Sequence, residues 1–299
     1  MSSINTLEEV KYSFETMSLQ GIACGGNETK DNVVLCLHGW LDNAASFLPL
    51  MSYFEGELVN KRVIAIDWPG HGNSSHRSLD AHYHFVDWVY DLVQLFEVNQ
   101  WQQVDIVAHS MGGMVASAFA AAFPEKVKSL VLIDSIGFIS STAEQTTQQL
   151  RDGMLSRFKG SALYNKQGGA KKKRYHPSID SAINARVSVS DLQFEHAKLI
   201  VERGLIKEVG GYRWRSDARL RNTSPYRLTL KQAQQFIRDI TCPVQLIYGS
   251  DGIDMVSTGI KSFGDLFQNF SSVELTGGHH VHMEQPQKTA ELIKSFLVE

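Results

Sequence analysis

The chain has 299 residues, of which 43% are hydrophobic and 20% charged, and its formal net charge is −3. A chain of this length holds one large domain, or one domain with an insertion, and the composition is typical of a globular protein. The slight excess of acidic residues argues against general nucleic-acid binding, which requires a basic surface.

Three further features predict the cellular setting. The cysteines Cys24, Cys36 and Cys242 are few and odd in number, which favours a reducing compartment over a disulfide framework. Residues 1–14 are polar and acidic, unlike a secretory signal peptide. No apolar run approaches the roughly 18 residues that a membrane span needs. We therefore expect a cytoplasmic protein that acts without a membrane partner.

Short apolar segments alternate with helical patterns along the chain. In chain order, the patterns predict a strand at 10–17, strands at 33–39 and 63–68, a helix at 82–98, a strand at 104–110, a helix at 111–123, strands at 127–134, 243–249 and 271–277, and a helix at 287–297. The central strand segments are almost entirely apolar, as in strands that helices cover on both faces. The alternation predicts an α/β fold with a doubly wound, mostly parallel sheet of about eight strands.

Residues 136–240 interrupt this alternation because they contain no long apolar strand pattern. Three hydroxyl residues in this segment precede Glu or Gln by three positions, the spacing of a capping box at a helix N-terminus: Ser141 with Glu144, Ser190 with Gln193 and Thr229 with Gln232. We therefore expect a helical insertion at 136–240, entered and left through the sheet. The remaining residues, 1–135 and 241–299, form the core domain.

The segment Ala108-His109-Ser110-Met111-Gly112-Gly113 contains the most specific motif in the chain. It follows a strand pattern and begins a helical one, which is the setting of the G-x-S-x-G nucleophile elbow. Small residues are needed there because the turn is sharp and holds the serine in a strained backbone conformation. Ala108 replaces the first glycine, a departure of one methyl group. The motif predicts that Ser110 is a catalytic nucleophile.

A second motif follows the strand pattern at 33–39, where the sequence reads His38-Gly39-Trp40-Leu41-Asp42. Enzymes with a serine elbow place a backbone donor at this point. Two N–H groups aimed at the developing oxyanion stabilise the tetrahedral intermediate. We expect the N–H groups of Trp40 and Met111 to be these donors.

Three histidines, His279, His280 and His282, lie between the last strand pattern and the last helix. A histidine on this loop can reach Ser110 over the edge of the sheet. Gly278 lets the loop pass close to the elbow, which favours the next residue, His279, as the general base. His280 and His282 form an H-x-H pair, but the sequence places no carboxylate or cysteine cluster beside it, so we expect no metal site.

Taken in order, the oxyanion segment, the serine elbow, an acid and the histidine resemble the active-site order of the α/β-hydrolases. Residues 67–74 resemble the D-x-x-G-x-G-x-S segment of capped members, and residues 278–286 fit G-H-x-x-x-x-E-x-P, which again selects His279. HGWLDN at 38–43 and HHVHM at 279–283 resemble the serine hydrolase-like branch. The resemblance covers nearly the whole chain and implies an α/β-hydrolase fold in which residues 136–240 form a cap over the active site.

Three aspartates are candidates for the acid that orients the histidine base. In the family this acid usually lies three residues after the glycine that ends the penultimate strand, which is Gly249 here, but that position is Gly252. Asp251 lies one residue earlier and is the preferred candidate. Asp134, at the end of an earlier strand, and Asp254 are the alternatives.

These residues predict hydrolysis of small-molecule carboxylic esters, with small or medium-length chains, by a Ser-His-Asp triad without a metal or cofactor. His38, Gly39, His109 and Trp214 are the candidates for contact with the substrate. The active unit is expected to be a monomer or a homodimer. Two alternatives stay open: hydrolysis of a carbon–carbon bond in a diketone by the same triad, and a slow or non-catalytic ligand-binding signalling protein of the same fold.

Overall fold

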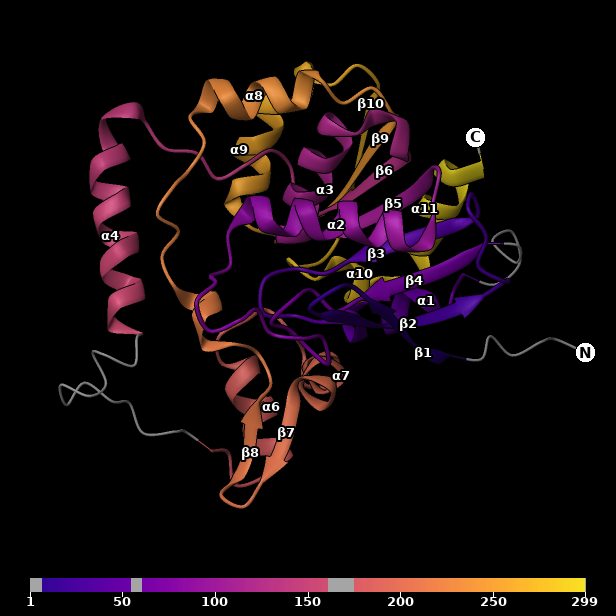
Figure 1. Ribbon diagram of the computed structural model, residues 1–299. Helices are drawn as coiled ribbons and strands as arrows, with labels where there is room; N and C mark the ends of the chain where they lie inside the picture. The colour runs from indigo at the N-terminus through magenta and orange to yellow at the C-terminus, as the bar shows by residue number, and fades with distance from the viewer. Residues whose placement is uncertain (1–6, 55–60, 161–174, 299) are drawn as a thin grey trace, which may run out of the picture.

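A computed structural model describes residues 7–54, 61–160 and 175–298, and its centre is an eight-stranded sheet (Figure 1). The strand order is β1-β2-β4-β3-β5-β6-β9-β10. Strand β2 pairs antiparallel with β1 and β4, and all other neighbours pair parallel. The strands are β1 (Glu8–Ser13), β2 (Ser18–Gly25), β3 (Val33–Leu37), β4 (Arg62–Ile66), β5 (Val104–His109), β6 (Val127–Ile133), β9 (Val244–Gly249) and β10 (Phe270–Leu275). The predicted doubly wound, mostly parallel sheet is confirmed.

Helices cover both faces of the sheet, so alternate residues of a strand belong to opposite layers. In β3, Leu35 packs in one core cluster and Cys36 in the other. The first layer consists of α2 (Phe85–Asn99), α3 (Met111–Ala122), α8 (Leu230–Arg238) and α9 (Asp254–Phe263). The second consists of η1 (Ala44–Phe47), α1 (Leu48–Met51), α10 (Val281–Glu284) and α11 (Pro286–Val298). Two 3-10 turns, η2 (Pro124–Lys126) and η6 (Gly264–Leu266), connect elements.

Strand β2 was absent from the predicted elements because its sequence contains glycine, which weakens a strand pattern. The structure explains Gly21: a Cβ there would lie 2.6 Å from the carbonyl oxygen of Ala65 on β4. Gly21 is therefore needed for the close approach of β2 to β4, and the same glycine weakens the strand pattern in the sequence. None of the helices in the described ranges combines the length and apolar composition that a membrane crossing requires.

The chain between β6 and β9 extends beyond the sheet, at the left and bottom of Figure 1. Besides α8, it contains η3 (Ala143–Gln145), α4 (Thr146–Lys159), α6 (Ile179–Val187), α7 (Phe194–Gly204), β7 (Leu205–Glu208), β8 (Gly211–Trp214) and η5 (Ala218–Arg221). The short antiparallel pair β7–β8 was not among the elements expected in the helical insertion. Four residues per strand are too few to give a recognisable pattern.

The three predicted capping boxes have three different outcomes. Thr229 and Gln232 form the expected box at the start of α8. The box predicted for Ser141 and Glu144 forms one residue later, between Thr142 and Gln145. The Ser190 prediction is wrong: its hydroxyl donates to the Arg186 carbonyl at 2.9 Å. The helix that follows, α7, begins at Phe194 with Gln193 at its N-cap, so Ser190 lies too far upstream to cap it.

Candidate active site

Ser110 lies at the sharp turn between β5 and α3, in a backbone conformation that L-residues rarely adopt (φ 51°, ψ −120°). The turn is tight because α3 starts directly against the sheet. A Cβ on Gly112 would lie 2.3 Å from the Leu37 carbonyl oxygen, and one on Gly113 would lie 2.6 Å from Ser135 Oγ. The motif glycines are therefore required by packing, and the strain predicted for the elbow serine is present.

Ser110 and His279 are joined by a hydrogen bond, and a second bond extends it to an aspartate. Ser110 Oγ lies 2.9 Å from His279 Nε2. His279 Nδ1 lies 2.6 Å from Asp134 Oδ2. With Nδ1–H donating to the carboxylate, Nε2 is left to accept the serine proton. The three side chains come from the ends of β5 and β6 and from the loop after β10, which meet at the carboxyl edge of the sheet.

Asp134 is held in place by the loop that follows β9. Its carboxylate is fully buried and accepts the N–H groups of Gly249 at 3.1 Å and of Ile253 at 3.4 Å. A Cβ on Gly252 would lie 2.4 Å from Asp134 Oδ1. The position at which the family usually has its acid is therefore a glycine because the Asp134 carboxylate occupies that space.

The preference for Asp251 over Asp134 is accordingly corrected. Asp251 is exposed, and its carboxylate accepts from the Ser250 hydroxyl at 3.2 Å. Asp254 is also exposed, as the first residue of α9. Neither contacts His279 in the described part of the chain, whereas Asp134 does.

The two predicted oxyanion donors belong to the two segments that pack next to Ser110 Cβ and follow Ser110. Met111 is the first residue of α3, where a backbone N–H has no intrahelical partner. Trp40 follows Gly39, and a Cβ on Gly39 would lie only 3.0 Å from Ser110 Cβ. The loop is fixed by its next N–H, since Leu41 donates to His71 Nε2 at 3.2 Å. The role of both N–H groups as oxyanion donors stays a prediction.

The residues expected to contact the substrate occupy different environments. Gly39 is next to Ser110, as described. His38 is fully buried: it accepts from the Trp68 N–H at 3.0 Å and contacts the Gly39 carbonyl at 2.7 Å. Trp214 packs against the core cluster of α6 and α7, with its ring 5.8 Å from that of His176. The burial of His38 closes it to solvent and argues against contact with a substrate. Trp214 is only partly buried, and its role stays a prediction.

His109 is fully buried as well, and it contacts the backbone of the proposed base. Its Nε2 lies 3.0 Å from the His279 carbonyl oxygen, and the two rings are 4.6 Å apart. A hydrogen bond to a carbonyl requires a proton on Nε2. Burial lowers the pKa of His109 well below its usual range, and neighbouring histidines add to this effect. His109 is thus a support for the His279 loop, which the sequence motif did not indicate.

A charged cluster lies beside the triad and was not recognised in the sequence, because its members are far apart in the chain. His280 lies between Asp42 and Asp191. Burial alone would lower the pKa of His280, but the two carboxylates outweigh it and raise that pKa to about 9. Burial likewise favours a raised pKa for Asp42, yet His280 and Arg186 hold it well below its usual range. The cluster therefore consists of charged groups at neutral pH.

Only one group of residues in the described ranges has the spacing of a metal site. Asp42, His109 and His280 each offer one ligand atom, and these atoms lie within 4.8 Å of one another. In the structure the carboxylate and the His280 ring instead form an ion pair. His282 does not join them: burial lowers its pKa to about 3, and its ring packs against Phe47. The H-x-H pair is thus divided between two environments.

Comparisons with known proteins identify the family of the chain. A profile of the α/β-hydrolase fold matches residues 32–175. The serine hydrolase-like protein of Danio rerio is 30% identical over 270 residues, which cover 88% of this chain and 81% of that protein. A crystal structure of a hypothetical protein from Pseudomonas aeruginosa is 32% identical, with a TM-score of 0.87 over 98% of this chain and 100% of the other. A thioesterase domain from the curacin biosynthetic pathway, 24% identical over 97% of this chain and 100% of the domain, has the same fold (TM-score 0.83). The chain therefore belongs to the α/β-hydrolase family, in its serine hydrolase-like branch.

Proposed function

We propose that this hydrolase cleaves carboxylic esters of small or medium chain length through an acyl-enzyme on Ser110. The hydrogen-bonded series from Ser110 through His279 to Asp134, at a strained elbow, is the observation on which the proposal depends. A serine is a weak nucleophile unless an adjacent base takes its proton. His279 is within hydrogen-bond distance to do so, and Asp134 would stabilise the imidazolium that forms.

The proposed reaction has two halves. Ser110 Oγ attacks the ester carbonyl as His279 Nε2 takes the hydroxyl proton, and the N–H groups of Trp40 and Met111 stabilise the oxyanion. His279 then protonates the leaving alcohol. In the second half, His279 activates a water molecule that hydrolyses the acyl-enzyme and restores the serine. Each step uses groups of this chain, and no metal or cofactor is required by the chemistry.

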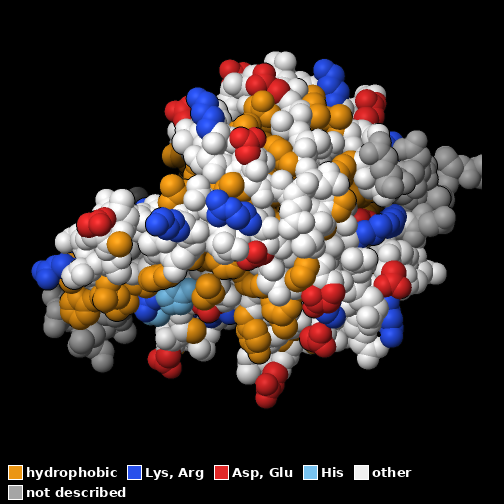
Figure 2. Space-filling view, turned by 90° about the horizontal axis from the view of Figure 1, so that it is seen from above, with side chains coloured by type: hydrophobic (Ala, Val, Ile, Leu, Met, Phe, Trp, Pro, Cys, Tyr) orange, Lys and Arg blue, Asp and Glu red, His pale blue; other side chains and the backbone are white. Residues whose placement is uncertain are grey.

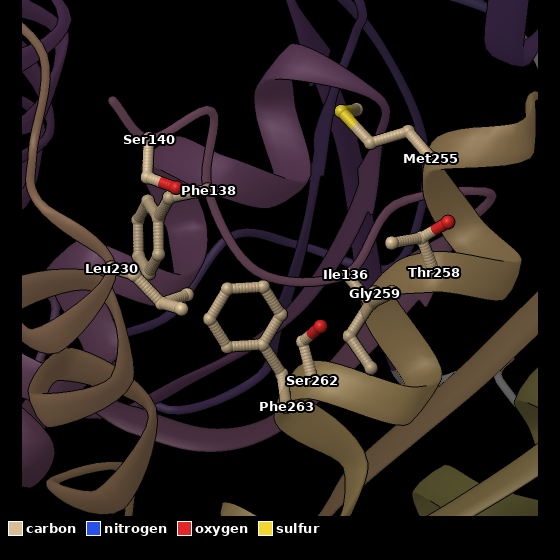
Figure 3. Close-up of a pocket in the computed structure, with 9 residues that line it drawn as sticks. All are labelled: Ile136, Phe138, Ser140, Leu230, Met255, Thr258, Gly259, Ser262 and Phe263. Carbon is tan, nitrogen blue, oxygen red and sulfur yellow. The ribbon is translucent and has the colours of Figure 1, made fainter. Parts of the chain in front are cut away.

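Residues 136–240 would act as the cap that selects the substrate. An open pocket of about 140 Å³ lies where the chain leaves the sheet for this segment (Figure 3). In Figure 3, Ile136, Phe138, Leu230 and Phe263 converge on it from the chain after β6, from α8 and from α9. The pocket begins two residues after Asp134, and its apolar lining suits an alkyl or aryl acyl group.

A fluorophosphonate probe and a series of p-nitrophenyl esters test this proposal together. We expect the probe to label the protein, and the acetate, butyrate and octanoate esters to be hydrolysed. The Ser110→Ala variant is the control and should lose both labelling and turnover. Labelling without ester turnover would favour a diketone hydrolase or a ligand-binding protein instead. If the probe fails to label the folded wild-type protein, Ser110 is not activated and the proposal fails.

A further inference from the structure

Four charged side chains form a continuous series between the insertion and the active-site loops. The Arg186 guanidinium donates to Asp42 Oδ1 at 2.5 Å, and His280 Nε2 lies 3.3 Å from Asp42 Oδ2. On its other side, His280 Nδ1 lies 2.6 Å from Asp191 Oδ1, and its backbone N–H donates to Asp191 Oδ2 at 3.0 Å. Positive and negative charges therefore alternate from Arg186 to Asp191, and we call these four residues the ion-pair chain.

The ends of the ion-pair chain come from the insertion, and its middle comes from the core. Arg186 is in the last turn of α6, and Asp191 follows in the loop before α7. Asp42 lies two residues beyond Trp40, whose N–H is a proposed oxyanion donor, and His280 is the direct neighbour of His279. One short stretch of the insertion, residues 186–191, is therefore bonded to both loops that carry the proposed catalytic groups.

The middle of the ion-pair chain is closed to solvent. Asp42 and His280 are each 3% exposed, and a buried charge that loses its partner is strongly destabilised. Gly278 leaves room for the Asp191 carboxylate to reach the His280 N–H, because a Cβ on Gly278 would lie 2.5 Å from Asp191 Oδ2. The loop thus has a glycine where the Asp191 carboxylate reaches its backbone. Asp191 restrains both the backbone and the ring of the residue next to His279.

From these contacts we infer that Asp191 and Arg186 are positioning residues, which align the His279 loop with the oxyanion loop only while residues 186–191 are docked. The inference rests on the proposed function of Ser110 and His279. The reason is geometric: His279 must stay within hydrogen-bond distance of two partners, and a misplacement of about 1 Å can lower the rate about 10²-fold. Displacement of this part of the insertion would therefore switch off the chemistry without any change in the triad residues.

Substitution of Asp191 tests the inference. We expect Asp191→Ala to lower kcat about 10²-fold and the rate of fluorophosphonate labelling in parallel, with KM changed less than about threefold. Asp191→Asn keeps one oxygen acceptor and should restore part of the loss. Asp180→Asn is the matched control, since Asp180 is an exposed carboxylate in the first turn of the same α6 and should behave as wild type.

A second measurement separates positioning from stability and does not depend on turnover. The proton in the His279–Asp134 hydrogen bond should give a low-field NMR resonance in the wild type that shifts or broadens in the folded Asp191→Asn variant and stays unchanged in Asp180→Asn. A lowered melting temperature with wild-type kcat, labelling rate and resonance would overturn the inference and show a structural role alone. An inactive, unlabelled wild type would instead overturn the proposed function, while the resonance would still test the positioning role.

Discussion

Two parts of the same insertion are attached to the core in different ways. The part that contains α6 and α7 has its own core cluster and several bonds to the sheet domain. In one of them, Arg203 Nε donates to the buried Asp67 at 3.0 Å, and in another Asn43 Nδ2 donates to the Ile200 carbonyl at 2.8 Å. By contrast, α4 projects from the body in Figure 1, and Gly153 is its one buried residue.

Helix α4 is mostly polar but exposes several apolar side chains. Hydrophobic side chains gather at the left of Figure 2, the side on which Figure 1 shows α4. More than two-fifths of each side chain is exposed in Leu150, Met154 and Leu155. Exposed apolar patches of this kind mark surfaces that meet ligands, membranes or other proteins. The part with α6 and α7 is therefore bonded directly to the active-site loops. Helix α4 is bonded to His84 through Arg157 at 2.6 Å and leaves several apolar side chains exposed.

The largest effect on activity is expected for substitutions in the triad. Asp134→Asn should lower kcat about 10⁴-fold, because the amide leaves His279 in the wrong tautomer. Asp251→Asn is the matched control and should keep turnover within twofold, since that carboxylate is exposed. Steady-state hydrolysis of p-nitrophenyl butyrate measures both. The opposite ranking of the two variants would restore Asp251 as the acid.

These aspartates also show how far the sequence predicts the site. Ser110 and His279 were identified because glycines beside them form a local motif, and local motifs are visible in one chain. The spacing from Gly249 favours Asp251 as the acid. This rule fails here because the Asp134 carboxylate, from the end of β6, occupies the space beside Gly252. Contacts between segments that lie more than 100 residues apart leave no such mark in a single sequence.

The fold was predicted more fully than the insertion for a related reason. Strands buried on both faces have a strong apolar pattern, which predicted the centre of the sheet. The anchoring of α6 and α7 depends instead on single long-range pairs, such as Arg186 with Asp42, 144 residues apart. A single charged residue produces no periodic pattern, so the sequence does not indicate which distant residue it will pair with.

Truncation of one side chain in α6 and one in α4 should lower the free energy of unfolding by different amounts. Ile183→Ala in α6 removes a side chain that is 1% exposed and should lower the free energy of unfolding by about 2–5 kcal/mol. Leu150→Ala in α4 removes a side chain that is 50% exposed and should change it by less than about 0.5 kcal/mol. Urea unfolding of both variants measures the difference. Equal losses would mean that α4 is anchored as firmly as α6.

The ion-pair chain should make the anchored half sensitive to alkaline pH. Folding raises the pKa of His280 from 6.5 to about 9, so the folded state binds this proton more tightly than the unfolded state. The stabilisation is therefore complete below about pH 6.5 and is lost as the pH rises through 9. Urea unfolding between pH 6 and 10 should show a steeper loss in the wild type than in His280→Gln. Parallel curves for the two proteins would show that His280 does not stabilise the docked state.

The smallest effect on stability is expected on the exposed face of α4, where the effect should appear in substrate choice instead. Leu155 is 44% exposed, so Leu155→Ser should change the free energy of unfolding by less than about 0.5 kcal/mol. If α4 meets the apolar part of the substrate, loss of this side chain should raise KM for the octanoate ester about three- to tenfold and leave KM for the acetate ester unchanged, because only the longer chain can bury surface against the helix. Gln148→Ser, an exposed change on the same helix, is the control. An equal change in KM for both esters would place the effect at the reacting centre, and no change for either would assign the apolar face of α4 to a partner other than the substrate.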